Sequence, residues 1–141
     1  MTDSPLATVL KDHSQNITRQ RLVVFNLLNE HEQLSMAELY ELAKTEMDRA
    51  SIYRITKLFE RLGIVQRVNL GWKYKLELSG RFAAHHHHLT CSSCQRVIPI
   101  SEIELEDFIS RIARRHKFKP AAHQVEIQGI CQACQIKNRL K

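Results

Sequence analysis

The feature that most constrains this chain is a dense group of metal-binding side chains beyond its middle. Four consecutive histidines, His85 to His88, are followed after two residues by a Cys-x-x-Cys pair, Cys91 and Cys94. A second pair, Cys131 and Cys134, lies near the C-terminus, and the two pairs contain all four cysteines of the chain. A Cys-x-x-Cys turn presents two sulfurs to one ion, so the two pairs predict a closed, structural Zn²⁺ site.

The composition agrees with this prediction. The chain has 141 residues, a formal net charge of +6 and a pI of about 9.4. It contains no apolar run near the roughly 18 residues of a membrane span, and its N-terminus does not resemble a signal peptide. We therefore expect a cytoplasmic protein, and in a reducing compartment Cys-x-x-Cys pairs favour zinc over disulfides. Two unrelated redox-active thiol pairs are the alternative, but no thioredoxin-like start surrounds them.

The histidine run predicts two half-sites back to back and not one site of four ligands. In an extended segment successive side chains point to opposite faces, so His85 and His87 face one way and His86 and His88 the other. Several side chains elsewhere could complete either half-site. The candidates are Glu77, Glu106, His31, His116 and His123. For His116, a position in the core is the more common role.

The first half of the chain predicts three helices followed by a β-hairpin. Helices are expected at about 18–30, from the Ser35–Glu38 capping box to about Thr45, and at about 49–62 before Gly63. A short helix is also possible around Leu6, Val9 and Leu10. Strands are expected at 64–68 and 73–78, joined by a turn at 69–72. This order is typical of a winged helix-turn-helix.

The expected third helix has one apolar and one polar, basic face. Ile52, Ile55 and Phe59 share the first, and Tyr53, Arg54, Lys57 and Arg61 fall on the second. Between Lys44 and Lys73 the chain has seven basic residues and three acidic ones. In a winged helix this face would enter the DNA major groove, although most charged helix faces are simply solvated.

Beyond a short hinge, the second half predicts a small mixed region. Residues 80–84 are the expected hinge, after which a strand is predicted at 96–100, with Pro99 indicating an edge position. A second capping box, Ser101 to Glu104, predicts a helix to about His116. A half-buried strand at 124–128 precedes the last cysteines. The overall class is α+β.

Taken together, these motifs resemble the ferric uptake regulator (Fur) superfamily of metal-sensing transcription factors. The resemblance rests on Thr18-x-x-Arg21, on residues 35–40, on Ser51-Ile52-Tyr53-Arg54, and on His86-x-His88-Leu89-x-Cys91-x-x-Cys94. It implies a winged-helix DNA-binding domain at 1–79, the hinge at 80–84, and a small α/β metal-binding dimerisation domain at 85–141. It also implies a homodimer that binds a palindromic double-stranded DNA operator when it is loaded with metal.

The resemblance also assigns the metal ligands. The four cysteines match the structural zinc site, and His85, His87, Glu106 and His123 match a regulatory metal site. A hinge site is matched by Glu77, His86 and His88, with His31 as a candidate fourth ligand, since Gln33 stands where the family usually has histidine. Tyr53 and Arg54 match recognition-helix positions, and further DNA contacts are predicted from Arg19, Arg21, Ser51 and Lys57.

The expected function is a metal-responsive regulator, most simply a repressor of metal-uptake genes. Three histidines and one carboxylate at the regulatory site suit Zn²⁺ slightly better than Fe²⁺, and Mn²⁺ stays open. This favours the zinc uptake regulator branch, and a peroxide- or manganese-sensing member is the alternative. From other classes, a zinc-storage or delivery protein needs no recognition helix, and a hydrolytic zinc enzyme needs a general base and a pocket. We predict no enzyme activity, no small-molecule substrate and no membrane association.

Overall fold

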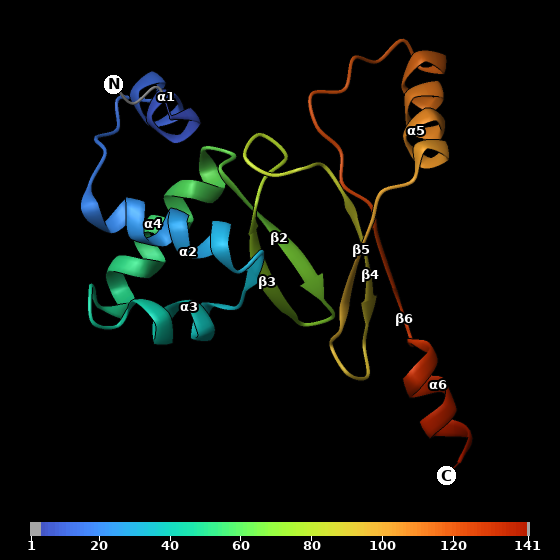
Figure 1. Ribbon diagram of the computed structural model, residues 1–141. Coiled ribbons are helices and arrows are strands. Elements are labelled where there is room, and N and C mark those ends of the chain that lie inside the picture. Colours follow the sequence, from blue (N-terminus) through green and yellow to red (C-terminus); the bar gives the residue numbers. More distant parts are fainter. Residues whose placement is uncertain (1–3, 141) are drawn as a thin grey trace. The chain divides into compact units, whose positions relative to one another are not determined.

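The computed structural model describes residues 4–140 (Figure 1). These residues form two compact units, and the boundary in the sequence lies between His85 and His86. Within the described residues, each unit combines helices with one three-stranded sheet. This mixture confirms the predicted α+β class. No helix in the described part of the chain is long and apolar enough to cross a membrane.

The first unit packs four helices against a small antiparallel sheet. The helices are α1 Pro5–Asp12, α2 Arg19–Glu30, α3 Met36–Ala43 and α4 Arg49–Arg61. The strands are β1 Gln33–Leu34, β2 Val65–Leu70 and β3 Lys73–Leu78, in the order β1-β3-β2. Apolar side chains from every helix and from the sheet form one buried core. Helices α2 to α4 followed by the β2–β3 hairpin are the predicted winged helix.

Local sequence signals set the ends of these helices. The Thr18 hydroxyl accepts the backbone N–H of Arg21 at 3.3 Å and starts α2. Both hydrogen bonds of the predicted Ser35–Glu38 capping box are present. Gly63 follows α4 with φ +66°, a left-handed conformation that favours glycine and ends the helix.

Three details of the first unit go beyond the sequence prediction. Helix α1 forms because Leu6, Val9 and Leu10 are buried in the core. Strand β1 was not expected, and it pairs Gln33 with Glu77 on β3. Strand β2 continues to Leu70, so the turn of the hairpin is tighter than the predicted 69–72, with Gly71 at φ +74°.

The second unit is built around strand β4, His87–Cys91, in the middle of its sheet. Strand β5, Val97–Ile100, pairs antiparallel on one side and β6, Glu126–Gly129, pairs parallel on the other. The parallel pair needs a long crossover, and this contains α5, Ile103–Arg115. Helix α6, Gln132–Arg139, follows β6. Strand β5 is an edge strand, which confirms the edge position indicated by Pro99.

The structure differs from the sequence prediction at three places in the second unit. The Ser101–Glu104 capping box does not form: Glu102 is the N-cap of α5, and its side chain makes no capping hydrogen bond. Helix α6 was not expected. His116 follows α5 as an exposed C-cap residue, so a core position for it is excluded.

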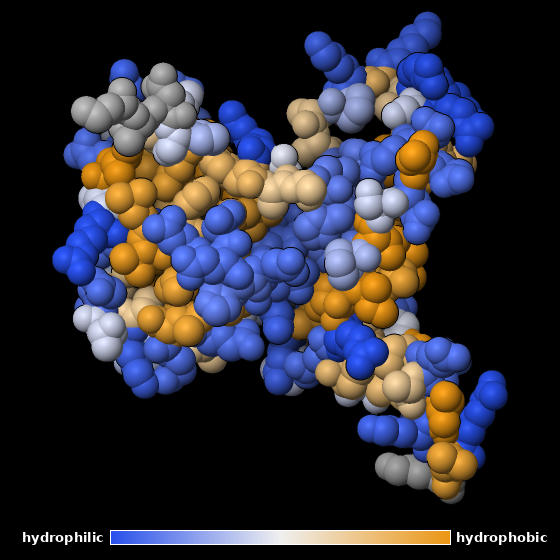
Figure 2. All heavy atoms as spheres, viewed as in Figure 1, coloured by the Kyte–Doolittle hydropathy of each residue, from blue (hydrophilic) through white to orange (hydrophobic). Residues whose placement is uncertain are grey.

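The second unit exposes much of its apolar surface. No residue of α5 is buried within Ile103–Arg115, and the large apolar side chains of Phe108 and Ile112 are exposed. Figure 2 shows further apolar side chains exposed over the β5-β4-β6 sheet and along α6. The described core cluster lies entirely in the first unit. The second unit therefore has an apolar surface that its own residues do not cover.

The two capping boxes provide a matched test of local helix signals. Ser35→Ala removes a hydrogen bond that is present, and we expect the free energy of unfolding to fall by about 1 kcal/mol. Ser101→Ala removes a hydroxyl that caps no helix, so we expect a change near zero. Urea unfolding followed by circular dichroism measures both. Equal losses in the two variants would contradict the assignment of the caps.

Candidate metal centres

The four cysteines come together at one end of the β4–β6 ladder. Cys91 ends β4, Cys94 lies in the following turn, Cys131 is the N-cap residue of α6, and Cys134 lies in its first turn. Their sulfur atoms all lie within 4.8 Å of one another, and the Sγ atoms of Cys94 and Cys131 are 3.7 Å apart. A tetrahedron with Zn–S bonds near 2.3 Å has edges of about 3.8 Å, so the donors fit one such ion.

Backbone hydrogen bonds favour the thiolate form of two of these cysteines. The N–H of Cys131 donates to Cys91 Sγ at 3.3 Å, and with the N–H of Cys94 it lowers the pKa of Cys91 to about 6. The N–H of Cys134 likewise lowers the pKa of Cys131. At Cys134, a hydrogen bond from the Ser93 hydroxyl is outweighed by the neighbouring Cys131 thiol and by burial, which raise its pKa to about 11. A thiolate is the metal-binding form of cysteine, so these hydrogen bonds prepare Cys91 and Cys131 to bind a cation.

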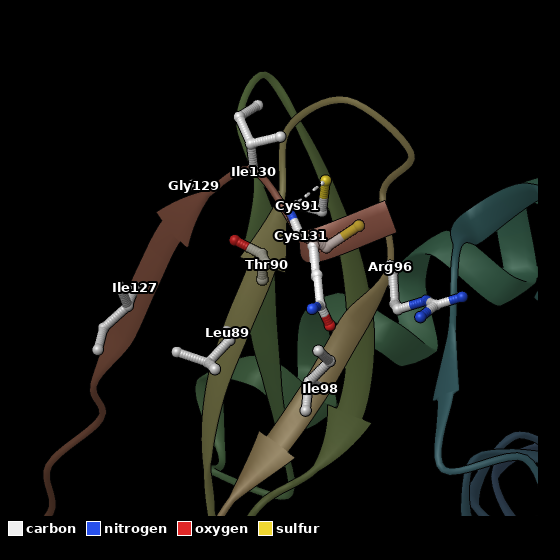
Figure 3. Close-up of a pocket in the computed structure, with 10 residues that line it drawn as sticks. Leu89, Thr90, Cys91, Arg96, Ile98, Ile127, Gly129, Ile130 and Cys131 are labelled. Carbon is white, nitrogen blue, oxygen red and sulfur yellow. Dashed lines mark hydrogen bonds between the residues drawn. The ribbon is translucent and has the colours of Figure 1, made fainter. Parts of the chain in front are cut away.

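An apolar depression of about 320 Å³ lies beside the cysteine cluster. Figure 3 shows Leu89, Ile98 and Ile127 on the three strands of the sheet, with the sulfur atoms of Cys91 and Cys131 at its end. The dashed line is the hydrogen bond from Cys131 to Cys91. Ile98 and Ile127 are 39% and 53% exposed, so this depression is part of the uncovered apolar surface.

A second set of donors lies around the start of β4. The carboxylate of Glu106 on α5 bridges two histidines: Oε1 lies 2.8 Å from His87 Nε2, and Oε2 lies 2.9 Å from His123 Nε2. His87 is fully buried, and its Nδ1 accepts the backbone N–H of Val125 at 3.2 Å. The neutral ring therefore carries its proton on Nε2 and donates it to Glu106. Two imidazoles and one carboxylate that converge in this way are a donor set suited to a divalent cation.

The other histidines follow the period of the strand. His87 turns toward Glu106, whereas the rings of His86 and His88 pack edge to face with their centroids 4.8 Å apart. His85 is the last residue of the first unit and is exposed. Its membership of the regulatory site stays a prediction from the sequence.

The predicted hinge ligand Glu77 is held by two glutamines of its own sheet. Its side chain is only 2% exposed on β3. Gln66 on β2 donates to Oε1 at 2.7 Å, and Gln33 on β1 donates to Oε2 at 3.1 Å. Both glutamines are register partners of Glu77. Gln33, which stands where the resembled family usually has a histidine, thus orients Glu77 in this chain. His31, the predicted fourth ligand of the hinge site, belongs to none of the donor sets among the described residues.

Helix α4 presents the predicted recognition face. Asp48 caps it by accepting the N–H of Ser51 at 2.7 Å, and its apolar side is buried in the core. On the opposite side Tyr53 is 54% exposed, and Arg54 donates to the Ser51 hydroxyl at 3.1 Å. At the start of the helix, the Arg49 guanidinium lies 3.9 Å from the centre of the Tyr40 ring on α3, a contact that the sequence did not predict.

The two predicted contacts at the start of α2 differ from each other. Arg19 is 82% exposed in its side chain and forms an ion pair with Glu46 at 3.0 Å. Arg21 instead donates to the carbonyl of Asn16 and, at 3.0 Å, to the side chain of Gln15. Arg21 therefore fixes the segment before α2, and Arg19 is the more accessible cation.

Comparison with known proteins places this arrangement in a family. A sequence profile of the Ferric uptake regulator family matches residues 12–128. The chain is 37% identical to the ferric uptake regulation protein of Bacillus subtilis (strain 168) over 134 residues, which is 89% of each chain. It is 30% identical to a protein of the same name from Neisseria gonorrhoeae over 138 residues, covering 92% of this chain and 93% of that one.

Solved structures agree with the sequence relatives. The crystal structure of the Vibrio cholerae ferric uptake regulator matches with a TM-score of 0.71 at 30% identity, over 89% of this chain and 99% of that one. A zinc uptake regulator complexed with zinc and DNA shares the fold, with a TM-score of 0.60 at 20% identity, over 96% of this chain and 93% of that one. The relatives are regulators and not enzymes, in line with the sequence prediction. The chain belongs to the ferric uptake regulator family.

Proposed function

We propose that this protein is a cytoplasmic, metal-responsive transcriptional regulator that binds a palindromic DNA operator as a homodimer. The observation that carries the proposal is the pairing of an accessible recognition helix with metal-donor sets that begin directly after the winged-helix unit. The His87–Glu106–His123 set offers the nitrogen and oxygen ligands that a divalent cation needs. The exposed face of α4 carries the polar and basic side chains that a recognition helix uses in the major groove.

The cysteine cluster would hold a structural Zn²⁺. Cys91, Cys94, Cys131 and Cys134 supply four sulfurs, which leaves no position open for a substrate or a sensed ligand. The ion would join the end of β4 to the start of α6, in a unit that buries little apolar surface of its own. Such a site contributes free energy of folding directly.

The regulatory site would use His87, Glu106 and His123, with His85 as the fourth ligand. Three nitrogens and one carboxylate suit tetrahedral Zn²⁺, so a zinc sensor is slightly favoured over an iron sensor. The proton that His87 donates to Glu106 must leave when Nε2 binds a cation, so metal loading weakens as the pH falls. Glu106 contacts both histidines, which makes it the residue that sets their separation.

A hinge metal would use Glu77, His86 and His88. Gln33 and Gln66 hold both carboxylate oxygens of Glu77 and so fix its orientation for a ligand role. Glu77 belongs to the first unit and the two histidines to the second, so a cation bound by all three would restrain the hinge. In the proposed mechanism this restraint spaces two recognition helices for successive major grooves.

The uncovered apolar surface of the second unit supports the homodimer. Phe108 is 52% exposed, Ile127 is 53% exposed and Ile136 is 52% exposed, on α5, β6 and α6 respectively. Strand β6 is also a sheet edge, whose backbone can pair with a second copy. A two-fold dimer matches a palindromic operator, because each protomer then reads one half-site.

The decisive experiment is selection of DNA from a pool of random duplexes by the full-length protein, carried out separately with Zn²⁺, Fe²⁺ under anaerobic conditions, and Mn²⁺. We expect enrichment of one palindromic sequence, strongest with Zn²⁺. Enrichment with Fe²⁺ or Mn²⁺ alone would overturn the zinc assignment and retain the regulator. Tight metal binding with no enriched sequence would favour a zinc-storage protein.

Removal of two regulatory ligands tests the sensor. His87→Ala with His123→Ala should weaken metal-dependent binding to the selected duplex more than about a hundredfold, because even outer-shell partners of a metal contribute tenfold to a hundredfold. Sedimentation should still show a folded dimer. The control is His13→Ala with His116→Ala, which removes two histidines outside every donor set of the described residues. Equal binding by the two double variants would contradict the assignment.

The structural role of the cysteines is tested by Cys91→Ser. A serine hydroxyl is a poor zinc ligand, so we expect the loss of about one Zn²⁺ per chain together with loss of the folded second unit. Elemental analysis and circular dichroism measure the two effects on one sample. A stable dimer without that zinc would show that the cluster is not structural.

A further inference from the structure

A continuous set of side-chain contacts connects the recognition helix to the β2–β3 hairpin. Lys57 Nζ lies 5.5 Å from the centre of the Tyr53 ring and 3.3 Å from Oε2 of Glu60. Glu60 also accepts two hydrogen bonds from Arg67 of β2: Nε donates to Oε1 at 2.5 Å, and Nη2 donates to Oε2 at 3.2 Å. The Arg67 guanidinium lies 4.0 Å from the centre of the Tyr74 ring on β3.

Glu60 is the central member of this set. Its carboxylate is shared by two cations, and its side chain is only 21% exposed. Burial opposes ionisation, but the hydrogen bonds from Arg67 and Lys57 outweigh it and lower the pKa of Glu60. Isolated surface ion pairs contribute little, whereas a bidentate arginine within a network is the geometry in which they do matter. The contacts thus fix both the helix–hairpin junction and the position of Lys57.

The position of Lys57 matters for DNA binding. It lies one helical turn from Tyr53, on the face that the recognition helix would turn toward the duplex. Its charge is compensated by Glu60, and its ammonium group lies over the Tyr53 ring. A lysine held in this way contributes less to phosphate binding than an unrestrained lysine at the same place.

We propose that Glu60 is a specificity-determining residue of the DNA interface: it keeps Lys57 on Tyr53 and away from the phosphates, and it fixes the recognition helix to the hairpin through Arg67. This inference rests on the proposed function, since it assumes that α4 enters duplex DNA. Phosphate contacts are independent of sequence, so holding Lys57 back lowers the affinity for random DNA. A Tyr53 ring that is already positioned loses less entropy when it meets a base.

Glu60→Gln tests the proposal, because it removes the charge and keeps the shape. The probes are the duplex selected with the wild-type protein and a random duplex of equal length, each titrated over a range of salt concentrations. On random DNA we expect log K to depend more steeply on log salt, by about 0.9 for each bound protomer, because Lys57 gains one phosphate contact. We expect the ratio of specific to random affinity to fall about threefold to tenfold, as Tyr53 loses its restraint.

Three further variants separate this role from a general effect of charge. Glu41→Gln removes the same charge from another i,i+3 pair with a lysine, in which Oε2 of Glu41 on α3 lies 2.6 Å from Nζ of the C-cap residue Lys44. For Glu41→Gln we expect the wild-type salt slope on random DNA and the wild-type ratio of specific to random affinity. In Lys57→Ala with Glu60→Gln, the salt slope should be no steeper than in Lys57→Ala alone. Thermal unfolding of each variant reports on the fold.

The outcomes distinguish the inference from the function on which it rests. A wild-type protein that selects an operator, while Glu60→Gln and Glu41→Gln behave alike, would overturn the inference and leave the regulator intact. A steeper slope that persists without Lys57 would also overturn it, because the released cation would then be another residue. A wild-type protein with no preference for any duplex would refute the regulator itself.

Discussion

The alternation of side chains along strand β4 is the constraint on which the rest of the second unit depends. Because successive residues of an extended segment face opposite ways, β4 directs His87 to Glu106, whereas His88 and the preceding His86 pack against each other. The same strand ends at Cys91 and so delivers the first ligand of the cysteine cluster. A shift of one residue in the pairing of β4 would exchange these roles.

Much of the first unit could be predicted from sequence because its helix ends are set locally. Thr18, the Ser35–Glu38 pair and Gly63 act within a few residues of the helix that they start or end. Ser101 shows the limit of such signals: the same residue types at the same spacing gave no cap when Glu102 took the N-cap position. A pattern states which hydrogen bond is available, and the tertiary structure decides which one forms.

The contacts that position the functional side chains could not be predicted in this way. Gln33 and Gln66 reach Glu77 only because both are register partners across the sheet, and they are 44 and 11 residues away in sequence. The Glu60–Arg67 pair likewise depends on where the hairpin returns to α4. By contrast, the grouping of the four cysteines was anticipated, because the chemistry of zinc ligands restricts which side chains can share an ion. For the histidines the same chemistry left five candidate partners open. Only the resemblance to a known family pointed to Glu106 and His123 as the partners of His87.

The parallel pairing of β4 with β6 has a consequence for the order in which the centres are filled. His87 and His123 flank one end of this two-strand ladder, while Cys91 and Cys131 flank the other. The ends are four residues apart, about 13 Å. The His87–Glu106–His123 donors therefore acquire their spacing only once the ladder has formed, and the cysteine cluster lies at the other end of that ladder. Under the proposed function, a newly made chain would have to bind the ion at its cysteines before the histidines could respond to a second one. Oxidation of the cysteines would then abolish the response with every histidine intact.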